Sequence, residues 1–422
     1  MDYNSSSNYI RKIELEVASV NIPGALYRDY TSSWSAVNKY YYEHMNFGEV
    51  GRGTFLYLSE DANRIASSCS SDWEKIIAAW ETIRSEVKWD EHDRLFPTQG
   101  LANIYNYKKI GSSADLNFLL LQLLRRLDID AHPMILSTRS NGRIYEHFVT
   151  IDRFNYMIVF VKSGEETYFL DATDRFCPPG MLPEKCLNGK GFAIMSTRGQ
   201  WHELPVGLTS STFINCEVNI DGSGSISGSL NCDRSNYSAA SFRRRFDRFN
   251  STEEFVDDFE KRNGGCVVTN YLIKNLDSVS VPVTESCKIE FSDKAVNMGD
   301  MLYVEPVLLG EITENPFRIE DREYPVDFTY PFKTLYMARF NLPEGYVIEE
   351  IPEPCRLVLE NNSASFTYTV TPVGQTVQVM CQFTISKPVF YQNEYKDLKE
   401  LYNQVVIKQA EPIILKVNTD EG

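Results

Sequence analysis

Hydrophobic residues recur at spacings of three and four along the first half of the chain and alternate with polar residues along much of the second half. The first pattern is typical of amphipathic helices and the second of half-buried strands. The expected helices of the first half cover residues 31–45, 72–89 and 114–127, and the expected strands cover residues 9–20, 131–137, 156–161 and 166–170. The helix over 114–127 is apolar almost all round, so we expect it at the centre of a domain. A central helix backed by antiparallel strands predicts an α+β arrangement.

From about residue 211 the stretches become short and are separated by Gly, Pro, Asn and Asp. They cover residues 218–226, 279–283, 286–291, 338–342, 364–370 and 376–385. Short alternating stretches between turn residues predict antiparallel β-sandwiches. Two further helices are expected, one over 252–262 after a Ser-Thr-Glu-Glu start and one over 394–406 with apolar residues along one face.

Length and charge narrow the class of protein. A chain of 422 residues predicts two to four domains, and its 43% hydrophobic content is that of a folded protein. The 42 Lys and Arg against 58 Asp and Glu give a net charge of −16, which argues against nucleic acid or an anionic membrane surface as a partner. The basic run Arg243–Arg245 lies among phenylalanines and is interpreted as a solvated helix face. No apolar run approaches the roughly 18 residues of a membrane-spanning helix.

The cysteines and histidines form no pattern that indicates a metal site. Nine cysteines are scattered without a CxxC pair and the five histidines are isolated, so neither a disulfide framework nor a zinc site is expected. Cys177 and Cys186 share one proline-containing loop and could either pair or stay unpaired. The chain has no acidic loop of the EF-hand type. We therefore expect no metal and no cofactor.

Three short motifs around the central helix carry the candidate chemistry. Ser113 lies in Gly-Ser-Ser-Ala-Asp at the helix start, where free N–H groups and the helix dipole stabilise an anion. Tyr156 begins one strand and Asp171 ends the next, and a turn at Gly164 places Tyr156 opposite Asp171 or Ala172. Each residue also has a structural interpretation: a helix cap, a side chain that fills the core and a carboxylate that fixes a turn.

Six phrases in order support a family resemblance: Val87–Trp89, Tyr107–Asp115, Ile135–Arg139, Phe154–Tyr156, Leu170–Asp174 and Leu182–Gly189. Through them residues 70–205 resemble the transglutaminase-like, papain-like domain of large bacterial envelope proteins of poorly defined function. Residues 320–415 resemble the β-rich C-terminal domain of the same proteins, through the phrases Arg322–Phe328 and Leu342–Tyr346. The resemblance implies a catalytic cysteine at Ser113, a histidine at Tyr156 and an acid at Asp171. Two of these three positions hold another residue.

The resemblance implies a multidomain α+β chain with a papain-like or transglutaminase-like core followed by antiparallel β-sandwich-type domains. The expected divisions are an N-terminal segment with the remnant of a β domain plus a helix over 1–60, the transglutaminase-like domain over 61–205, a β-rich domain over 206–325 and a C-terminal β domain with a terminal helix over 326–422. Trp89 and Asn155 are candidates for lining the cleft. The polar N-terminus has no signal sequence, which fits a cytoplasmic protein or a processed or truncated exported one. Because the family is typically exported, we expect the periplasm or the cell envelope.

The exchanged residues separate three possible functions. A serine nucleophile needs a general base within hydrogen-bond reach, and tyrosine, with a pKa of about 10, is neutral at pH 7 and a poor base. We therefore predict a catalytically inactive protein that binds a peptide or protein ligand in its cleft. One alternative is an active cysteine- or serine-type peptidase or acyl transferase, in which His132 or His147 approaches Ser113 or Cys177 is the nucleophile. The other is an envelope scaffold with a vestigial cleft, which a cleft filled by side chains would favour.

Overall fold

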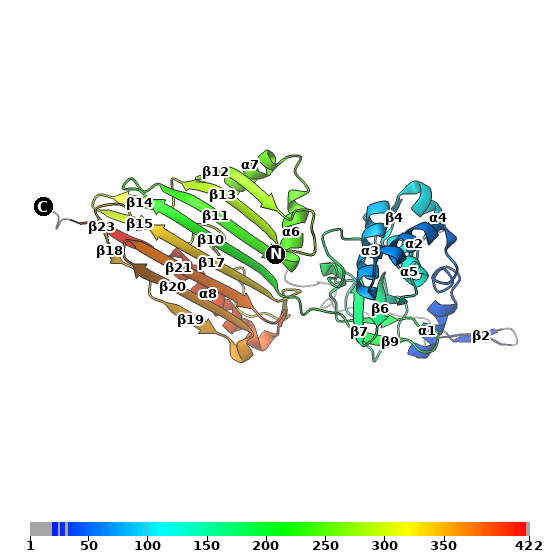
Figure 1. Ribbon diagram of the computed structural model, residues 1–422. Coiled ribbons are helices and arrows are strands. Elements are labelled where there is room, and N and C mark those ends of the chain that lie inside the picture. The colour runs from blue at the N-terminus through cyan, green and yellow to red at the C-terminus, as the bar shows by residue number, and fades with distance from the viewer. Residues whose placement is uncertain (1–18, 24–25, 30–32, 99, 419–422) are drawn as a thin grey trace. The chain divides into compact units, whose positions relative to one another are not determined.

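The computed structural model describes residues 19–23, 26–29, 33–98 and 100–418. The chain divides between Val206 and Gly207 into an N-terminal unit and a C-terminal unit, each described by itself below (Figure 1). Helices and antiparallel strands occur in both, so the chain is a multidomain α+β protein with a β-rich second part. The strand expected over 9–20 lies outside the described residues except for its last two positions, which begin strand β1.

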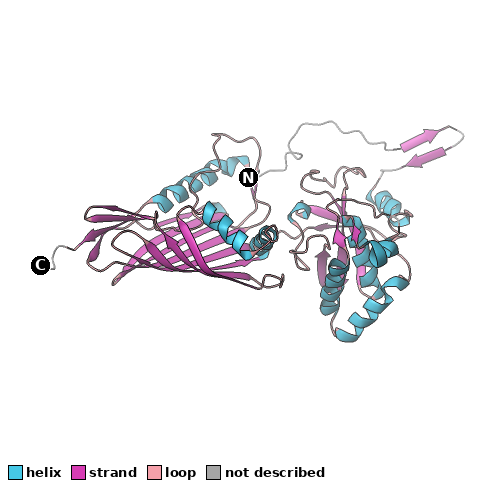
Figure 2. Ribbon diagram, turned by 90° about the horizontal axis from the view of Figure 1, so that it is seen from above, coloured by secondary structure: helices cyan, strands magenta, loops and turns pink. Residues whose placement is uncertain are grey.

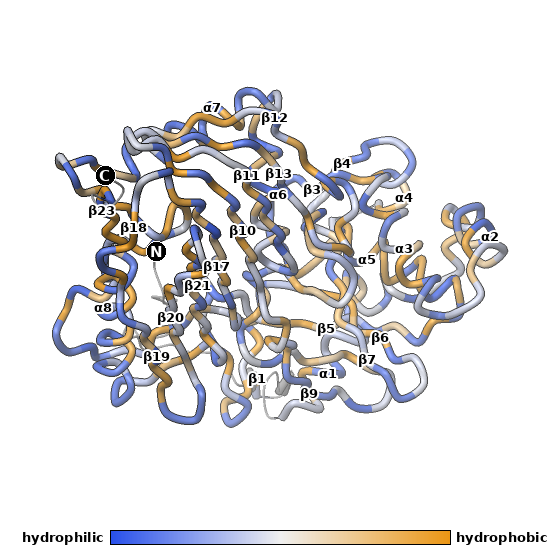
Figure 3. The backbone as a smooth tube through the Cα atoms, turned by 60° about the vertical axis from the view of Figure 1, so that its left-hand side comes forward, coloured by the Kyte–Doolittle hydropathy of each residue, from blue (hydrophilic) through white to orange (hydrophobic). Residues whose placement is uncertain are grey.

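The N-terminal unit is built around helix α5, Ser113–Arg126, in which every residue up to Leu124 is buried. A five-stranded antiparallel sheet in the order β7-β6-β5-β8-β9 packs on α5 through β5 and β6, and helices α2 and α3 also contact it. The strands are β5 Asp130–Leu136, β6 Tyr156–Ser163, β7 Glu166–Leu170, β8 Lys190–Ala193 and β9 Gln200–Glu203. The hydrophobic residues of β5 and β6 stand out in Figure 3.

The other elements of this unit surround the core. They are the hairpin β1 Ser19–Ile22 and β2 Leu26–Asp29, the helices α1 Trp34–Glu43, α2 Ser59–Ser68, α3 Asp72–Glu86 and α4 Leu101–Asn103, the short turns η2 Leu56–Leu58, η3 Ile104–Lys108 and η4 Glu184–Cys186, and the parallel pair β3 Lys88–Trp89 and β4 Ile110–Gly111. Helices α3 and α5 each begin with a capping box, formed by Ser71 with Glu74 and by Ser112 with Asp115. The helices expected from the spacing of apolar residues, and the three strands after the central helix, are confirmed.

The C-terminal unit contains an eight-stranded sheet in the order β12-β13-β11-β10-β17-β21-β20-β19, in which only the pair β10–β17 is parallel (Figure 1). Its strands are β10 Ser210–Ile220, β11 Ile226–Ser235, β12 Cys266–Lys274, β13 Val283–Phe291, β17 Phe332–Asn341, β19 Cys355–Val358, β20 Ala364–Val373 and β21 Thr376–Ile385. Alternate residues of these strands are buried on one face, which we call the inner face.

Helices and a smaller sheet cover the inner face (Figure 2). They are α6 Asn236–Phe246, α7 Thr252–Arg262, α8 Tyr395–Ala410 and the four-stranded sheet of β14 Ala295–Met298, β15 Met301–Val304, β23 Ile413–Val417 and β18 Tyr346–Glu350. The short pair β16 Val326–Asp327 and β22 Val389–Phe390 and the turns η5 Glu360–Asn362 and η6 Gln392–Glu394 complete the unit. Helix α6 contacts β10 and β11, α7 contacts β12, and α8 contacts β20.

Four details differ from the expectations. The strands on either side of residue 325 join one sheet in one compact unit, whereas separate domains over 206–325 and 326–422 were expected. Helices face the large sheet where a second large sheet of a sandwich was expected. The stretch 218–226 is the end of β10, a turn and the first residue of β11, because Asp221 accepts hydrogen bonds from Ser223 N and Ser225 N and closes a turn there. At the other end of the chain, residues 34–60 belong to the N-terminal unit.

Within the described ranges, no helix has the length and hydrophobicity that crossing a membrane requires.

Candidate functional site

The start of helix α5 holds the position expected for a nucleophile. Ser113 is the first helical residue, after the capping Ser112, and it is 0% exposed. Its Oγ accepts a hydrogen bond from Arg94 N at 2.8 Å and donates one to Arg94 O at 3.2 Å. Its N–H donates to His92 O at 3.0 Å. The hydroxyl and the N–H group that could act on a substrate at this helix start are therefore both occupied by the main chain of residues 92–94.

Residues 90–98, here called the covering segment, are anchored on α5 at two points. Besides the contacts with Ser113, Asp115 Oδ1 accepts hydrogen bonds from Thr98 N at 2.6 Å and from Thr98 Oγ1 at 2.9 Å. The imidazole of His92 is 71% exposed, and its Nδ1 lies 2.9 Å from Asp90 O. The sequence gives no indication of this segment's position, because it is held over Ser113 by main-chain atoms that every residue type carries.

Tyr156 and Asp171 meet, as the hairpin predicts. Tyr156 is fully buried, and its Oη donates to Asp171 Oδ2 at 2.8 Å and lies 3.1 Å from Thr173 Oγ1. The register of the hairpin pairs Val159 with Leu170, so that Tyr156 lies level with Thr173 and not with Asp171 or Ala172. The reason is that the turn has two residues, where a four-residue turn was expected. The long tyrosine side chain bridges the difference.

The carboxylate of Asp171 is saturated with donors. Asn117 Nδ2 donates to Oδ2 at 2.9 Å, while Thr173 N and Thr173 Oγ1 donate to Oδ1 at 2.8 and 2.5 Å. With Tyr156, four donors fill the acceptor sites of one carboxylate. Asn117 also binds Met157 O at 2.9 Å and accepts from Ala172 N at 2.8 Å. It was not among the predicted site residues, although an asparagine inside an otherwise apolar helix was the signal that could have found it.

The protonation of Tyr156 decides its role. Burial, followed by the negative charge of Asp171, raises the pKa of the Tyr156 hydroxyl well above its usual value. The hydroxyl is therefore neutral and acts as a hydrogen-bond donor to Asp171. A neutral phenol whose O–H group is hydrogen-bonded to a carboxylate cannot act as the base that takes the proton of a serine.

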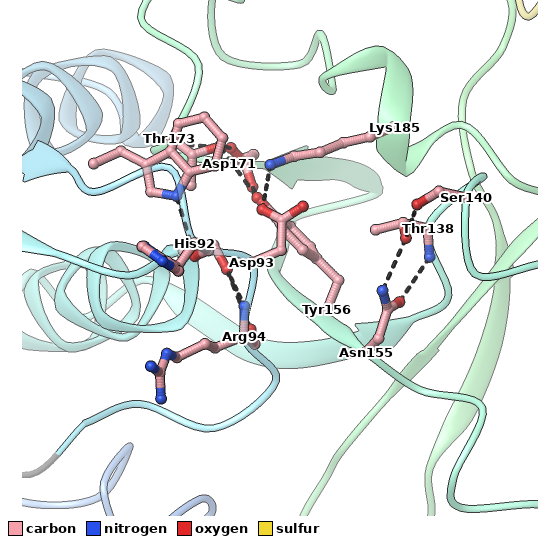
Figure 4. Close-up of polar contacts among 12 residues, drawn as sticks. His92, Asp93, Arg94, Thr138, Ser140, Asn155, Tyr156, Asp171, Thr173 and Lys185 are labelled. Atoms are coloured by element: carbon pink, nitrogen blue, oxygen red, sulfur yellow. Dashed lines mark hydrogen bonds and ion pairs between the residues drawn. The ribbon is translucent and has the colours of Figure 1, made fainter.

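Lys185, on turn η4, fills the space beside Tyr156. Its Nζ lies 2.6 Å from Asp93 Oδ1, 4.1 Å from the centre of the Trp89 ring and 4.6 Å from the centre of the Tyr156 ring. Figure 4 shows Lys185 and Asp93 meeting next to Tyr156. A cation between two rings is a stabilising arrangement. Trp89, expected to line a cleft, is in contact with this lysine.

Asn155, the other cleft candidate, is part of a loop contact. Its Oδ1 accepts from Thr138 N at 2.9 Å and its Nδ2 donates to Thr138 Oγ1 at 2.9 Å. In Figure 4 its amide points toward Thr138 and Ser140, away from Lys185 and Asp93. Its side chain therefore fixes the chain after β5.

The alternative catalytic groups are engaged elsewhere, exposed or buried. His132 Nε2 lies 2.8 Å from Asp130 Oδ1 at the start of β5, His147 is an exposed loop residue, and neither forms a hydrogen bond with Ser113. Burial raises the pKa of the Cys186 thiol well above its usual value, which makes this cysteine a poor nucleophile. Cys177 is also buried, and Cys186 forms no disulfide, so the possible disulfide between these two cysteines is absent. Across the described residues, no group of three or more His, Cys, Asp or Glu side chains could hold a metal ion.

Comparison with known proteins adds a domain family and a fold. Residues 300–415 match a family described as a domain of unknown function with a solved structure, DUF3858. The fold of the chain is similar to the crystal structure of a "putative protease" from Parabacteroides distasonis ATCC 8503, with a TM-score of 0.52 and 11% sequence identity. That alignment covers 97% of this chain and 64% of the other, so the chain spans less than two thirds of the length of its structural relative. No curated protein matches the sequence.

Proposed function

We propose that this chain is a non-catalytic scaffold or binding protein of the cell envelope, in which a protease-like core serves as a structural module. The observation that carries the proposal is the state of Ser113, whose hydroxyl is buried and hydrogen-bonded only to the backbone of Arg94. The envelope location rests on the family resemblance alone. The likeness to a protease supports the fold of the core and not an activity.

The chemistry of the three expected catalytic positions supports inactivity. A serine alcohol has too high a pKa for a helix dipole alone to activate it, so it needs a base. Tyr156 stands where the base is expected, and its hydroxyl donates a hydrogen bond to Asp171. The acid that would orient a histidine is instead saturated by four hydrogen bonds, and Lys185 occupies the space beside the tyrosine. A site with these contacts stabilises the fold and leaves no room at Ser113 for a substrate.

Labelling with a fluorophosphonate probe tests this proposal, because the probe reacts with activated serines. The full chain and its Ser113→Ala variant are incubated with the probe beside an active serine hydrolase, and adducts are located by mass spectrometry. We expect no adduct on Ser113 under conditions that label the hydrolase completely. An adduct on Ser113 that is absent from the variant would establish an active serine and defeat the proposal.

A double variant distinguishes two interpretations of the site: a closed core, and an open cleft in which only the catalytic residues have been replaced. Ser113→Cys with Tyr156→His restores the expected nucleophile and base. In an open cleft, this pair should recover some peptide hydrolysis or acyl transfer. Under a closed core, the folded variant stays inactive, because the backbone of Arg94 still covers residue 113. Measurable turnover would favour a peptide-binding cleft as the protein's function.

A further inference from the structure

The C-terminal unit has a hollow where the two halves of its large sheet meet. The parallel strands β10 and β17 join these halves, with Ser210 next to Phe332 and Thr212 next to Thr334. Helix α6 packs on β10 and β11 on one side of the junction, and α8 packs on β20 on the other. Two cavities of about 420 and 320 Å³ open on the inner face between them and share Phe332 and Thr334 in their walls. Each has the size of a small-molecule site.

The larger cavity has a positive lining. Arg234 and Arg245 lie in its wall and no Asp or Glu does, in a chain whose net charge is −16. The remaining walls consist of Ser and Thr hydroxyls and of aromatic rings, among them the stacked pair Tyr237 and Tyr330 with centroids 4.2 Å apart. Hydroxyls and cations together are the donors that a carboxylate or phosphate group needs.

The two arginines have hydrogen-bond donors to spare. Arg234 forms an ion pair with the buried Glu285, and Arg245 forms one with Asp258 at 2.5 Å. A guanidinium carries five N–H donors, of which a single carboxylate takes at most two in the paired geometry. The cavity therefore offers unused positive donors.

The smaller cavity is mainly apolar. Ile214, Leu309 and Phe383 are among its walls, and a single carboxylate, that of Glu314, lies in its lining. That carboxylate is 73% exposed and pairs with Arg318 at 2.7 Å, so it is directed to solvent. A ligand that extends from the larger cavity past Phe332 would thus pass from cationic to hydrocarbon surroundings.

We infer that this junction binds a small amphipathic anion. Its carboxylate or phosphate group lies near Arg234 and Arg245, and its hydrocarbon body extends past Phe332 toward Ile214. A bare inorganic anion would leave the apolar cavity unused, and a neutral hydrocarbon would leave the cations unpaired. The inference concerns the C-terminal unit alone and does not depend on whether Ser113 is active.

Calorimetric titration of the full chain with three matched probes tests the inference. Octanoate carries both features, 1-octanol carries only the hydrocarbon, and inorganic phosphate carries only the charge. We expect octanoate to bind one molecule per chain and the other two probes to bind at least tenfold more weakly. Absence of octanoate binding, or equal affinity for octanoate and either of the other probes, would overturn the inference.

Variants locate the site. Arg245→Gln removes one cation, an ion pair whose side chains are about one third exposed and a contact with the Phe255 ring, so the fold should persist. It should weaken octanoate binding at least fivefold and leave 1-octanol unchanged. Arg234 is less suitable, because its replacement leaves the carboxylate of Glu285 without its ion-pair partner, and that side chain is only 4% exposed. Arg339→Gln, on an exposed position of β17, is the control and should have no effect. Equal effects of Arg245→Gln and Arg339→Gln would place any binding elsewhere and contradict the inference.

A second variant keeps the test decisive. Thr334→Phe enlarges a half-buried side chain shared by both cavities, and it should abolish octanoate binding while the variant remains folded. Unchanged octanoate affinity in a folded Thr334→Phe protein would show that the ligand lies outside the hollow. If this variant does not fold, the octanoate affinities of Arg245→Gln and Arg339→Gln decide whether the ligand binds in the hollow.

Discussion

Replacement of Tyr156 by phenylalanine tests whether the expected catalytic residues now stabilise the core. Tyr156→Phe keeps the buried ring and its contact with Lys185 and removes only the hydroxyl that donates to Asp171 at 2.8 Å. A hydrogen bond to a charged group contributes roughly 1.5–3 kcal/mol. Asp171 keeps its bonds from Asn117 and Thr173, so it is not left without donors. We expect the free energy of unfolding to fall by about 2 kcal/mol, in the middle of that range.

The assay uses a property of this sequence. All five tryptophans, at positions 34, 73, 80, 89 and 201, lie in the N-terminal unit. Tryptophan fluorescence during urea unfolding therefore reports on this unit alone, whatever the C-terminal unit does. In a thermal scan, the same loss should lower Tm by about 2–4 °C for each kcal/mol in a unit of this size.

Tyr168→Phe is the matched control. Tyr168 lies on the neighbouring strand β7, is half-buried and stacks on Trp73 with ring centres 4.6 Å apart. Its hydroxyl forms no hydrogen bond with the described residues, so its removal should change the free energy of unfolding by less than about 0.5 kcal/mol. Equal, small effects of both substitutions would refute the structural role assigned to Tyr156.

Three further predictions concern the stability, the pH dependence and the cysteine accessibility of the protein. Lys185→Met removes an ion pair that is about one third exposed and two cation–π contacts. We expect the free energy of unfolding, measured in urea, to fall by about 1–2 kcal/mol. An unchanged free energy of unfolding would show that these contacts do not stabilise the unit. Burial lowers the pKa of His132 from 6.5, so the unfolded chain binds the proton first and stability should fall as pH drops below about 6.5. That decline in the free energy of unfolding should be smaller in His132→Gln. Identical pH profiles of stability in the two proteins would contradict the role given to His132. Iodoacetamide should label the partly exposed Cys69 and Cys355 in the native protein long before the buried Cys186, and early labelling of Cys186 would revive a cysteine nucleophile.

The sequence predicts the parts of the N-terminal unit that depend on local pattern. The run from Ala114 to Leu127 is long and apolar almost all round, and such a run predicts a buried helix. A short turn between two alternating stretches implies a hairpin, and the hairpin brings Tyr156 to Asp171. The covering segment could not be predicted, because Arg94 N donates to Ser113 Oγ and Arg94 O accepts from it, and both are main-chain atoms.

Long-range pairing limits what the sequence predicts in the second half. Strands β10 and β17 pair residue 210 with residue 332, and no local signal links positions so far apart. The sequence pattern suggested two domains, and this pairing joins their strands into one sheet. The cavities at this junction result from the same pairing, so the sequence does not predict them either. The turn at Asp221-Gly222 carried a recognisable Asp-Gly signal that the strand expected over 218–226 overlooked.

The accessibility of residue 113 tests the closed core most directly. In a Ser113→Cys variant whose tryptophan fluorescence is native, the rate of iodoacetamide labelling at residue 113 is measured by peptide mass spectrometry and compared with the rate in urea. A buried residue reacts only when the structure opens, so we predict labelling on the order of a thousandfold slower, or more, in the native protein. Native labelling within about tenfold of the unfolded rate would mean that residue 113 faces an open cleft, and the account of a closed, structural core would be wrong.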